Sequence, residues 1–376
     1  MERYDVIIVG AGIAGASAGY FLSQTHRVLV LEREQQPGYH STGRSAALFT
    51  ETYGNASIRA LTTGARPFFE SPPAGFAEEP LLTPRGLLYV GRADQRQALE
   101  RLYREVAGLA REIRHVSGEE CMAICPILRD GYAVAGLVEP DCSDIDVGSL
   151  HQGYLKGIRS RGGRILTDAE VRRAAPLPDG GWSVDTPAGG FTAAILVNAA
   201  GAWADEMAAL AGLAPLGLTP KRRTALRVEV PMGVDCASWP MVVDAEEALY
   251  FKPDAGSLLV SPADETPSPP CDVQPDEMDI AIAIDRLESM TTLSVRRPSH
   301  KWAGLRTFAP DKTLVAGFEP GRRDFLWLAG QGGYGIQTSP SMGRIAAALV
   351  RGDAFPPDLD ALGLDYGTLC VERLRS

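Results

Sequence analysis

Residues 5–32 read DVIIVGAGIAGASAGYFLSQTHRVLVLE, and this stretch decides the fold of the amino-terminal part of the chain. An apolar run over 6–9 meets a glycine-rich turn, and a helical pattern follows it. A second apolar run over 28–31 then ends at Glu32. Strand, glycine turn, helix, strand and acid, in this order and length, predict a βαβ unit that binds a dinucleotide.

The three glycines of the turn have separate roles in such a unit. Gly10 turns the chain, Gly12 lets the backbone approach a pyrophosphate, and Gly15 lets helix and strand pack closely. The helix N-terminus then presents its N–H groups and positive dipole end to the phosphates. Glu32 lies 20 residues after Gly12, where a carboxylate can accept both ribose hydroxyls. At this point NAD and FAD both remain open.

Composition narrows the class of protein. The formal charge is −10, from 37 Lys and Arg against 47 Asp and Glu, which argues against nucleic acid and anionic membranes as partners. No apolar run reaches the roughly 18 residues of a membrane span, so no transmembrane segment is predicted. Six scattered cysteines without a signal peptide predict reduced thiols and a cytoplasmic protein. Neither cysteines nor histidines show metal spacing, so no metal site is predicted.

The remainder of the chain contains two groups of strand-like runs. Runs over 164–174, 182–186 and 191–197 predict a meander with glycine turns. Four further runs, over 223–230, 241–244, 248–251 and 257–261, predict strands of one separate sheet.

A second glycine-rich loop lies near the carboxyl end, at Gly330–Gly335. Serine followed by proline at 339–340 predicts that a helix begins there and runs to about residue 350. Its N-terminus would stabilise a negative charge, as the first helix does.

These segments together resemble the FAD-dependent D-amino acid oxidase superfamily. The resemblance is carried by GAGIAG with Glu32, STGRS (41–45), VNAAGAW (197–203) and GQGGYGIQTSP (330–340). Within the superfamily the chain looks most like the bacterial D-arginine dehydrogenases. The longest matches there are QPGYHSTGRSAA (36–47), PPAGF (72–76), HQGYL (151–155), LVNAAGAW (196–203), PLGLTPKRR (215–223), KPDAG (252–256) and WAGLR (302–306).

The resemblance implies an α/β (α+β) fold in which a β-sheet-rich substrate domain is inserted into a Rossmann-like FAD-binding domain. The FAD-binding domain is expected over 1–80, 143–217 and 307–376, and the substrate-binding domain over 81–142 and 218–306. No cysteine lies in the segment that attaches flavin covalently in sarcosine oxidases, so the FAD is expected to be non-covalent.

The resemblance also implies which residues hold the cofactor. They comprise the first glycine turn, the acid after the second strand, the 41–47 segment, the small residues near 200 and the second glycine loop. They are Gly10, Gly12, Ile13, Ala14, Gly15, Glu32, Arg33, Ser41, Thr42, Gly43, Ser45, Ala46, Ala47, Val171, Ala200, Gly201, Trp203, Gly332, Gly333, Tyr334, Gly335, Ile336, Gln337 and Thr338.

The implied reaction is oxidation of a free D-amino acid. The α-hydrogen leaves as hydride to flavin N5, and the imino acid hydrolyses to a 2-oxo acid and ammonia. Arg223 and Arg306 correspond to the carboxylate clamp, a task that suits planar guanidinium groups. Tyr250 would add a hydroxyl, and Tyr53 matches the tyrosine of a mobile loop that closes over substrate. The electron acceptor, whether oxygen, a quinone or a dye, is left open.

The chain departs from the D-arginine dehydrogenases in the substrate pocket, to which Gly333 is also assigned. Leu87 stands where those enzymes have the glutamate that grips a cationic side chain, and Leu48 replaces their histidine. An unpaired buried guanidinium costs several kcal/mol, so apolar D-amino acids are predicted in preference to D-Arg and D-Lys.

Three alternatives remain beside this prediction. The chain could be an amine oxidase for glycine, sarcosine or D-proline, or a 2-hydroxy acid dehydrogenase. It could also be a non-catalytic flavoprotein subunit of a larger complex.

Overall fold

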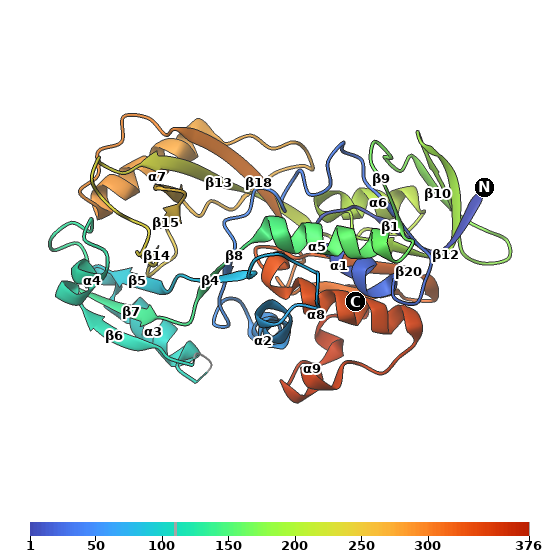
Figure 1. Ribbon diagram of the computed structural model, residues 1–376, viewed down its shortest axis with the longest axis horizontal. Coiled ribbons are helices and arrows are strands. Elements are labelled where there is room, and N and C mark those ends of the chain that lie inside the picture. The colour runs from blue at the N-terminus through green and yellow to red at the C-terminus, as the bar shows by residue number, and fades with distance from the viewer. Residues whose placement is uncertain (109–110, 376) are drawn as a thin grey trace.

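The computed structural model describes residues 1–108 and 111–375, and two large sheets organise them into two lobes (Figure 1). An eight-stranded sheet forms the lobe that holds the N-terminus, and a nine-stranded sheet forms the other lobe. A small sheet of β3 (Leu48–Phe49), β8 (Ser143–Ile145) and β4 (Leu82–Pro84) lies between them.

The eight-stranded sheet has a parallel centre in which β1 pairs with β2 and β12, β2 pairs with β9, and β12 pairs with β20. The antiparallel pairs β10–β11, β11–β12 and β19–β20 extend it. Its strands are β1 (Glu2–Val9), β2 (Val28–Leu31), β9 (Arg164–Leu166), β10 (Arg173–Pro176), β11 (Trp182–Thr186), β12 (Gly189–Asn198), β19 (Val315–Glu319) and β20 (Arg322–Ala329).

Alternate residues of the central strands enter two separate cores, because successive side chains of a strand point to opposite faces. Val6 and Ile8 of β1 pack with the helices α1 (Ile13–Leu22), α2 (Ala56–Glu70), α5 (Val147–Ser160) and α8 (Gly335–Arg351). Ile7 and Val9 pack on the other face against α6 (Ala204–Leu210) and the β10–β11 ribbon. Helix α1 lies between α5 and α8, and this sandwich holds the first glycine turn in place.

The nine-stranded sheet combines strands from distant parts of the sequence. Strand β14 pairs in parallel with β5, which joins the segment before residue 92 to the segment after residue 240. The strands are β5 (Leu87–Gly91), β6 (Arg114–Ser117), β7 (Ala135–Glu139), β13 (Thr219–Glu229), β14 (Met241–Asp244), β15 (Tyr250–Asp254), β16 (Ser257–Ser261), β17 (Thr266–Pro267) and β18 (His300–Phe308). The prediction of one sheet for the four runs between 223 and 261 is confirmed.

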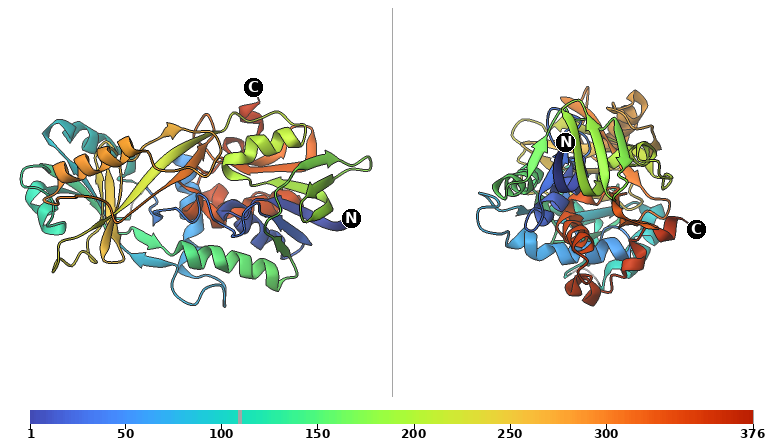
Figure 2. Two further views of the ribbon diagram at one scale, coloured as in Figure 1. Left: turned by 90° about the horizontal axis from the view of Figure 1, so that it is seen from above. Right: turned by 90° about the vertical axis from the view of Figure 1, so that its right-hand side faces the viewer.

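Helices cover the outer part of this second lobe. Helix α7 (Glu277–Met290) packs against β13 and β16, and it is the orange helix over that lobe in Figure 2, left. Helices α3 (Arg96–Val106) and α4 (Gly118–Ile124) lie beside β5, β6 and β7. The remaining short elements are η1 (Ala93–Gln95), η2 (Gly201–Trp203), α9 (Pro357–Ala361), η3 (Tyr366–Thr368) and η4 (Glu372–Leu374).

Two local predictions are wrong. The predicted strand over 164–174 is two strands: β9 pairs with β2, β10 pairs with β11, and Asp168 between them has a left-handed φ of 53°. Helix α8 begins at Gly335 rather than at Ser339, so Pro340 lies inside it. Pro340 has no N–H for the Ile336 carbonyl, and the Ser339 hydroxyl donates to that carbonyl instead, at 2.9 Å.

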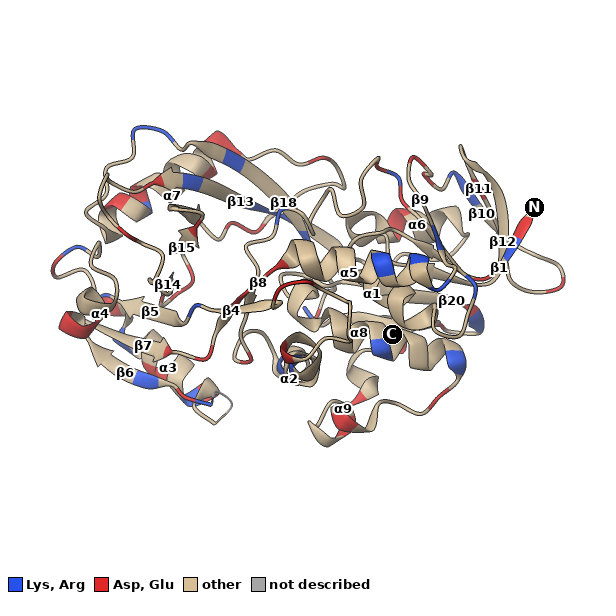
Figure 3. Ribbon diagram, in the orientation of Figure 1, with Lys and Arg blue, Asp and Glu red and all other residues tan. Residues whose placement is uncertain are grey.

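Acidic and basic residues are interspersed over both lobes (Figure 3). Within the described ranges, every helix is too short or too polar to cross a membrane. The predicted division of the chain into five domain segments stays a prediction.

Candidate functional site

The first glycine turn is as tight as its sequence predicts. Gly10 has a φ of 100°, and a Cβ there would lie 2.5 Å from the Ala199 carbonyl oxygen. A Cβ on Gly15 would lie 1.9 Å from the Gly10 carbonyl oxygen, so no side chain fits there. These two glycines let α1 start directly at the carboxyl end of β1.

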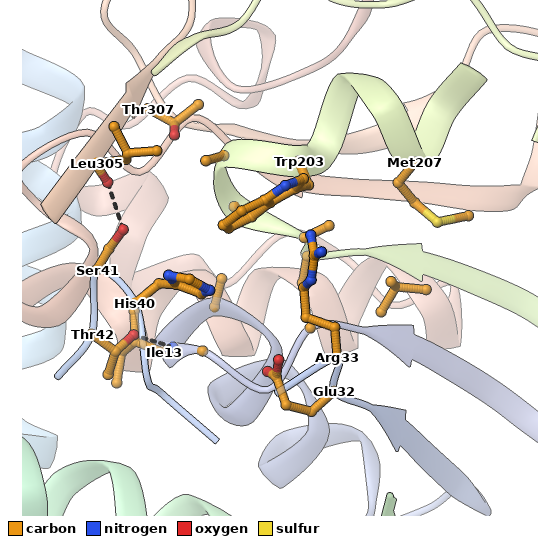
Figure 4. A pocket seen from close by; sticks show the side chains of 18 of the residues that line it. Ile13, Glu32, Arg33, His40, Ser41, Thr42, Trp203, Met207, Leu305 and Thr307 are labelled. Carbon is orange, nitrogen blue, oxygen red and sulfur yellow. Dashed lines mark hydrogen bonds between the residues drawn. The ribbon is translucent and has the colours of Figure 1, made fainter. Parts of the chain in front are cut away.

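Residues 41 and 42 fasten a second segment against this turn (Figure 4). Thr42 Oγ1 accepts a hydrogen bond from Ile13 N–H at 3.0 Å, in the first turn of α1. Ser41 Oγ donates to the Leu305 carbonyl of β18 at 2.5 Å. The 41–45 segment is thereby tied to both lobes at the point where a phosphate would approach α1.

Glu32 directly follows β2, and the residue is only 8% exposed. Its oxygens accept hydrogen bonds from Ala11 N–H at 2.9 Å and Glu34 N–H at 3.0 Å. A carboxylate has about four acceptor positions, so acceptor capacity is left for ribose hydroxyls. Beside it, the Arg33 guanidinium lies 4.7 Å from the centre of the Trp203 ring, a cation–π contact at the rim of the same cleft (Figure 4).

Three adjoining cavities join this turn to the interior of the second lobe. The first, which we call the dinucleotide cavity, contains about 1170 Å³ including the part open to solvent. The predicted cofactor residues that line it are Gly10, Gly12, Ile13, Ala14, Glu32, Arg33, Ser41, Thr42, Val171, Ala200, Gly201, Trp203 and Gly332.

The second cavity, which we call the substrate cavity, contains about 770 Å³ on the same measure. The predicted residues that line it are Ser45, Ala46, Ala47, Leu48, Tyr53, Leu87, Arg223, Tyr250, Arg306, Gly333, Ile336 and Gln337. All four predicted catalytic residues are therefore brought together in one space.

The third cavity, which we call the bridging cavity, shares Ile13, Ser41 and Thr42 with the dinucleotide cavity. It shares Arg223 and Arg306 with the substrate cavity, and Gly335 also lines it.

Four predicted cofactor residues line none of the three cavities. Gly15 packs on Gly10, and Gly43 N–H donates to the Gly38 carbonyl. Tyr334 caps α8, and Thr338 Oγ1 donates back to the Tyr334 carbonyl at 2.9 Å. These four residues support the residues that line the cavities, rather than lining the cavities themselves.

The two predicted clamp arginines differ in their partners. Both lie on one face of the β13–β18 pair, since Arg306 faces Lys221 and Arg223 faces Gly304 in the register. Arg223 Nε donates to the Asp264 carbonyl at 2.9 Å, and its Nη2 lies 3.3 Å from Glu265 Oε1. For Arg306, no carboxylate oxygen of the described residues comes within 4.0 Å. Arg306 therefore presents the uncompensated positive charge of the substrate cavity.

Three tyrosines surround Arg306. Burial raises the pKa of Tyr250, but the positive charges of Arg306 and Arg223 outweigh it, and the net pKa lies below the ordinary value. Tyr53 packs against Tyr334 with ring centres 4.8 Å apart, and burial raises the pKa of Tyr334 well above its usual range. A carboxylate beside Arg306 would meet a hydroxyl at Tyr250 whose proton is a stronger donor than that of an ordinary tyrosine.

The opposite side of the substrate cavity is apolar. Strand register sets it: Leu87 faces Met241, and Tyr89 faces Val243 across the parallel β5–β14 pair. Leu48 completes this side from β3.

Sequence reasoning missed several residues of the cavities. Tyr89 follows Leu87 by two positions and so shares its face, a period that could have identified it. Glu247 also lines the substrate cavity, on an exposed turn with a φ of 56°, and nothing local in the sequence indicates this. Other missed residues include His40, Leu305, Thr307 and Gln331 in the dinucleotide cavity and Thr50, Met241, Val243 and Ala263 in the substrate cavity.

The dinucleotide cavity fits a long dinucleotide. Only the Thr42 hydroxyl, at 3.3 Å, would meet a Cβ on Gly12, so the cavity reaches the backbone there. The N-termini of α1 and α8 both face this string of cavities, through Ile13 and Gly335. A dinucleotide cleft that opens onto a second cavity, where Arg306 has no carboxylate partner among the described residues, is the arrangement expected of a dinucleotide-dependent oxidoreductase.

The family model of the FAD dependent oxidoreductases, abbreviated DAO, matches residues 5–349. The chain belongs to this family, and its dinucleotide is therefore FAD.

Curated relatives are distant in sequence but cover nearly the whole chain. Glycine oxidase of Geobacillus kaustophilus is 24% identical over 372 residues, which are 93% of this chain and 93% of the relative. N-methyl-L-tryptophan oxidase of Salmonella enteritidis is 23% identical over 380 residues, 95% of this chain and 97% of the relative. Mitochondrial dimethylglycine dehydrogenase of Mus musculus is 24% identical over 390 residues, which cover 97% of this chain but only 44% of the longer relative.

Solved structures share the fold. A crystal structure of glycine oxidase from Geobacillus kaustophilus has a TM-score of 0.82 at 23% identity, covering 94% of this chain and 96% of that one. The reduced L-alpha-glycerophosphate oxidase of Mycoplasma pneumoniae with FAD bound has a TM-score of 0.83 at 21% identity, covering 93% and 95%. At these identities the comparison defines the fold, and the predicted α/β (α+β) class is confirmed.

Proposed function

We propose that this protein oxidises the Cα–N bond of free α-amino acids. The observation that carries the proposal is Arg306, which lines the substrate cavity without an acidic partner among the described residues. A guanidinium held this way lacks the anion that would offset its burial, and a substrate carboxylate supplies one in bidentate geometry. Tyr250 adds a hydroxyl beside it, and the ring of Tyr53 covers Tyr334 at the edge of the cavity.

FAD supplies an electron-pair acceptor for the α-hydrogen when it is bound. The task of this chain is to bind and orient the substrate. Arg306 and Tyr250 fix the carboxylate, and Leu48, Leu87, Met241 and Val243 receive the side chain. With the carboxylate and the side chain fixed, only one enantiomer directs its α-hydrogen toward the bridging cavity, and this gives stereochemical selection. No cysteine lines any of the three cavities, in support of non-covalent FAD.

The substrates we propose are D-amino acids with apolar side chains. The resemblance to D-amino acid oxidising enzymes suggests D-amino acids, and the leucines at 48 and 87 favour an apolar side chain. Each buried apolar Å² contributes about 25 cal/mol, so a leucine-sized or methionine-sized side chain gains where glycine leaves the apolar side unfilled. One acid, Glu247, stands exposed at the same cavity, so D-Arg and D-Lys belong in any substrate panel.

A second candidate is oxidation of glycine or an N-methylated amine. Its support is the similarity to glycine oxidase and to N-methyl-L-tryptophan oxidase, which act on such compounds by name.

The test is anaerobic mixing of the FAD-loaded protein with a panel of substrates, followed by loss of flavin absorbance. The panel contains D- and L-forms of Leu, Met, Phe, Val, Arg and Lys, then glycine, sarcosine, D-proline, D-lactate and 2-hydroxyglutarate. Fastest reduction by an apolar D-amino acid supports the proposal, and fastest reduction by glycine or sarcosine supports the second candidate. Reduction by hydroxy acids alone would identify a 2-hydroxy acid dehydrogenase, and no reduction by any compound would favour a non-catalytic subunit. The steady-state assay uses an electron-accepting dye in place of oxygen, because the natural electron acceptor is not identified.

A further inference from the structure

Glu139 is a buried carboxylate that the carboxylate clamp does not use. It is the last residue of β7 and is 3% exposed. No Lys, Arg or His nitrogen of the described residues comes within 4.0 Å of its oxygens. A buried carboxylate without a cation is costly, and such groups mark candidate functional positions.

Two hydroxyls connect Glu139 to the substrate cavity. Thr52 Oγ1 donates to Glu139 Oε2 at 2.7 Å, and Thr50 Oγ1 donates to Glu139 Oε1 at 3.3 Å. The two hydroxyls lie 2.9 Å from each other. Thr50 itself lines the substrate cavity together with Arg306 and Tyr250.

Strand register holds this group against the cavity. Glu139 faces Leu87 directly across the antiparallel β5–β7 pair, so both side chains lie on the same face of the sheet. Thr50 is fixed from the other side, where its N–H donates to Gln337 Oε1 of α8 at 3.4 Å. Thr50 Oγ1 accepts a hydrogen bond from Thr52 N–H at 3.4 Å and donates its one proton toward Glu139. A hydroxyl oxygen has two lone pairs, so one is left to accept a proton from the cavity.

The reaction requires such an acceptor. An amino acid at neutral pH carries an ammonium group, and loss of hydride from Cα needs the nitrogen lone pair that this proton occupies. The clamp residues Arg306 and Arg223 are cations, so neither accepts the proton at neutral pH.

We propose that Thr50 and Glu139 form a relay that takes the proton of the substrate ammonium, an inference that rests on the proposed function. The ammonium N–H bond breaks and its proton goes to Thr50 Oγ1, while the hydroxyl proton of Thr50 passes to Glu139 Oε1. The amine keeps its lone pair, and one positive and one negative charge are replaced by a neutral pair. Thr50 contacts the substrate, whereas Glu139 acts through Thr50.

The electrostatic surroundings suit this task. Burial raises the pKa of Glu139, and its hydrogen bonds with Thr52, Cys142 and Thr50 oppose that rise. Glu51 raises it further by charge repulsion, although Arg66 lies 2.6 Å from Glu51 and compensates part of its charge. The tyrosine nearby, Tyr89, is itself neutral because burial raises its pKa. An acceptor whose pKa moves toward the working pH transfers protons more effectively.

The test is the pH dependence of anaerobic flavin reduction in the FAD-loaded wild type, Glu139→Gln, Thr50→Val and Thr50→Ser. Without the relay, the ammonium must deprotonate in solvent, so the ascending limb of kcat/KM in Glu139→Gln and Thr50→Val should move up by about one pH unit or more. Both variants should recover to within about threefold of the wild type at the alkaline end. Thr50→Ser retains a hydroxyl and should keep the wild-type limb.

Two results would overturn the relay while leaving the proposed function intact. One is a uniform loss of rate in Glu139→Gln with an unmoved limb, which is the signature of a structural anchor. The other is a limb that moves in Glu139→Gln but not in Thr50→Val, because the proton would then not pass through Thr50.

A second measurement does not depend on turnover, and its deciding observation is made on the wild type. The ligand 2-aminoisobutyrate has an amine and a carboxylate but no α-hydrogen, so it binds without being oxidised. Infrared difference spectra of the wild-type holoprotein should show a new protonated-carboxyl band on binding, and Glu139→Gln should lack it. Absence of the band in the wild type would overturn the relay. Failure of the proposed function is recognised separately, as flavin that no amino acid of the panel reduces.

Discussion

A Cβ atom on Gly333 would lie 2.9 Å from Nη1 of Arg306 and 3.2 Å from its Cζ. The glycine loop before α8 therefore leaves the space that the guanidinium occupies in the substrate cavity. Gly333 has no left-handed φ, so its role here is spatial rather than conformational.

Gly333→Ala should displace Arg306 without unfolding the protein, because the neighbour that must move is the end of a flexible side chain. We expect KM for the amino acid to rise about tenfold or more, since a charge-assisted hydrogen bond contributes about 1.5–3 kcal/mol. Steady-state kinetics and a melting curve check this. Gly148→Ala, on an exposed position of α5, is the matched control and should leave KM unchanged. A wild-type KM in Gly333→Ala would show that the guanidinium does not hold the carboxylate.

Replacing each clamp arginine by lysine should separate their roles. Arg306→Lys loses the planar guanidinium of the side chain that has no carboxylate partner among the described residues, and kcat/KM should fall about 10- to 100-fold. Arg223→Lys should cost less, because Asp264 and Glu265 already engage that guanidinium. Arg222→Lys is the control, since its guanidinium lies 2.8 Å from Asp279 of α7. Equal losses at 306 and 223 would mean that both arginines grip the substrate directly.

Leu87→Glu should move the preference toward cationic side chains. A carboxylate on the apolar side of the cavity gives D-Arg a partner, and the ratio of kcat/KM for D-Arg to that for D-Leu should rise about tenfold or more. Stability should fall, because residue 87 directly faces Glu139 and like charges opposite one another repel. Leu87→Gln, which is polar but uncharged, should keep the wild-type order. An unchanged ratio in Leu87→Glu would place the substrate side chain elsewhere, for example near Glu247.

Acid should destabilise the first glycine turn through His151. This side chain of α5 is 5% exposed, and its Nε2 donates to the Ala11 carbonyl at 2.8 Å. Burial lowers the pKa of His151, so the folded state favours the neutral ring. The associated stability is fully present above the unfolded pKa of about 6.5 and is lost as pH falls through the folded value.

The measurement is the melting temperature of the holoprotein between about pH 7.5 and 5.5, compared with His151→Gln. Glutamine retains a donor for Ala11 but cannot become charged in this range, so its melting temperature should fall less with acid, by about one or two degrees. The raised pKa of Glu139 acts with the opposite sign, stabilising at low pH, but it is common to both proteins and cancels. Parallel pH slopes for the two proteins would exclude His151 as the cause.

Sequence could predict the parts of this molecule whose signals are local. The βαβ unit is one such part, because Gly10, Gly15 and Glu32 lie within a single stretch and their spacing predicts the geometry of the unit. The start of α8 was less accessible. Serine before proline is a genuine helix-start signal, but here the Ser339 hydroxyl serves the Ile336 carbonyl inside the helix, and the true start lies four residues earlier.

The composition of the substrate cavity depends on pairing between distant strands. Met241 reaches Leu87 only through the parallel pairing of β5 with β14, for which the sequence has no local sign. Glu139 and Thr50 meet for the same kind of reason, across 89 positions. The clamp residues were predicted from the resemblance to a family, because other members of that family already show which distant residues meet in the site.

The wall formed by Arg223, Tyr250 and Arg306 belongs to the bridging cavity and the substrate cavity at once. A ligand that orders this wall from one cavity should therefore increase the affinity of the ligand in the other cavity. Such coupling is reciprocal. The factor by which FAD tightens amino acid binding equals the factor by which the amino acid tightens FAD binding. Loss of cofactor on dilution should therefore slow when a non-oxidisable amino acid is present. A competitive inhibitor of this enzyme would then also preserve its holoprotein during purification and storage.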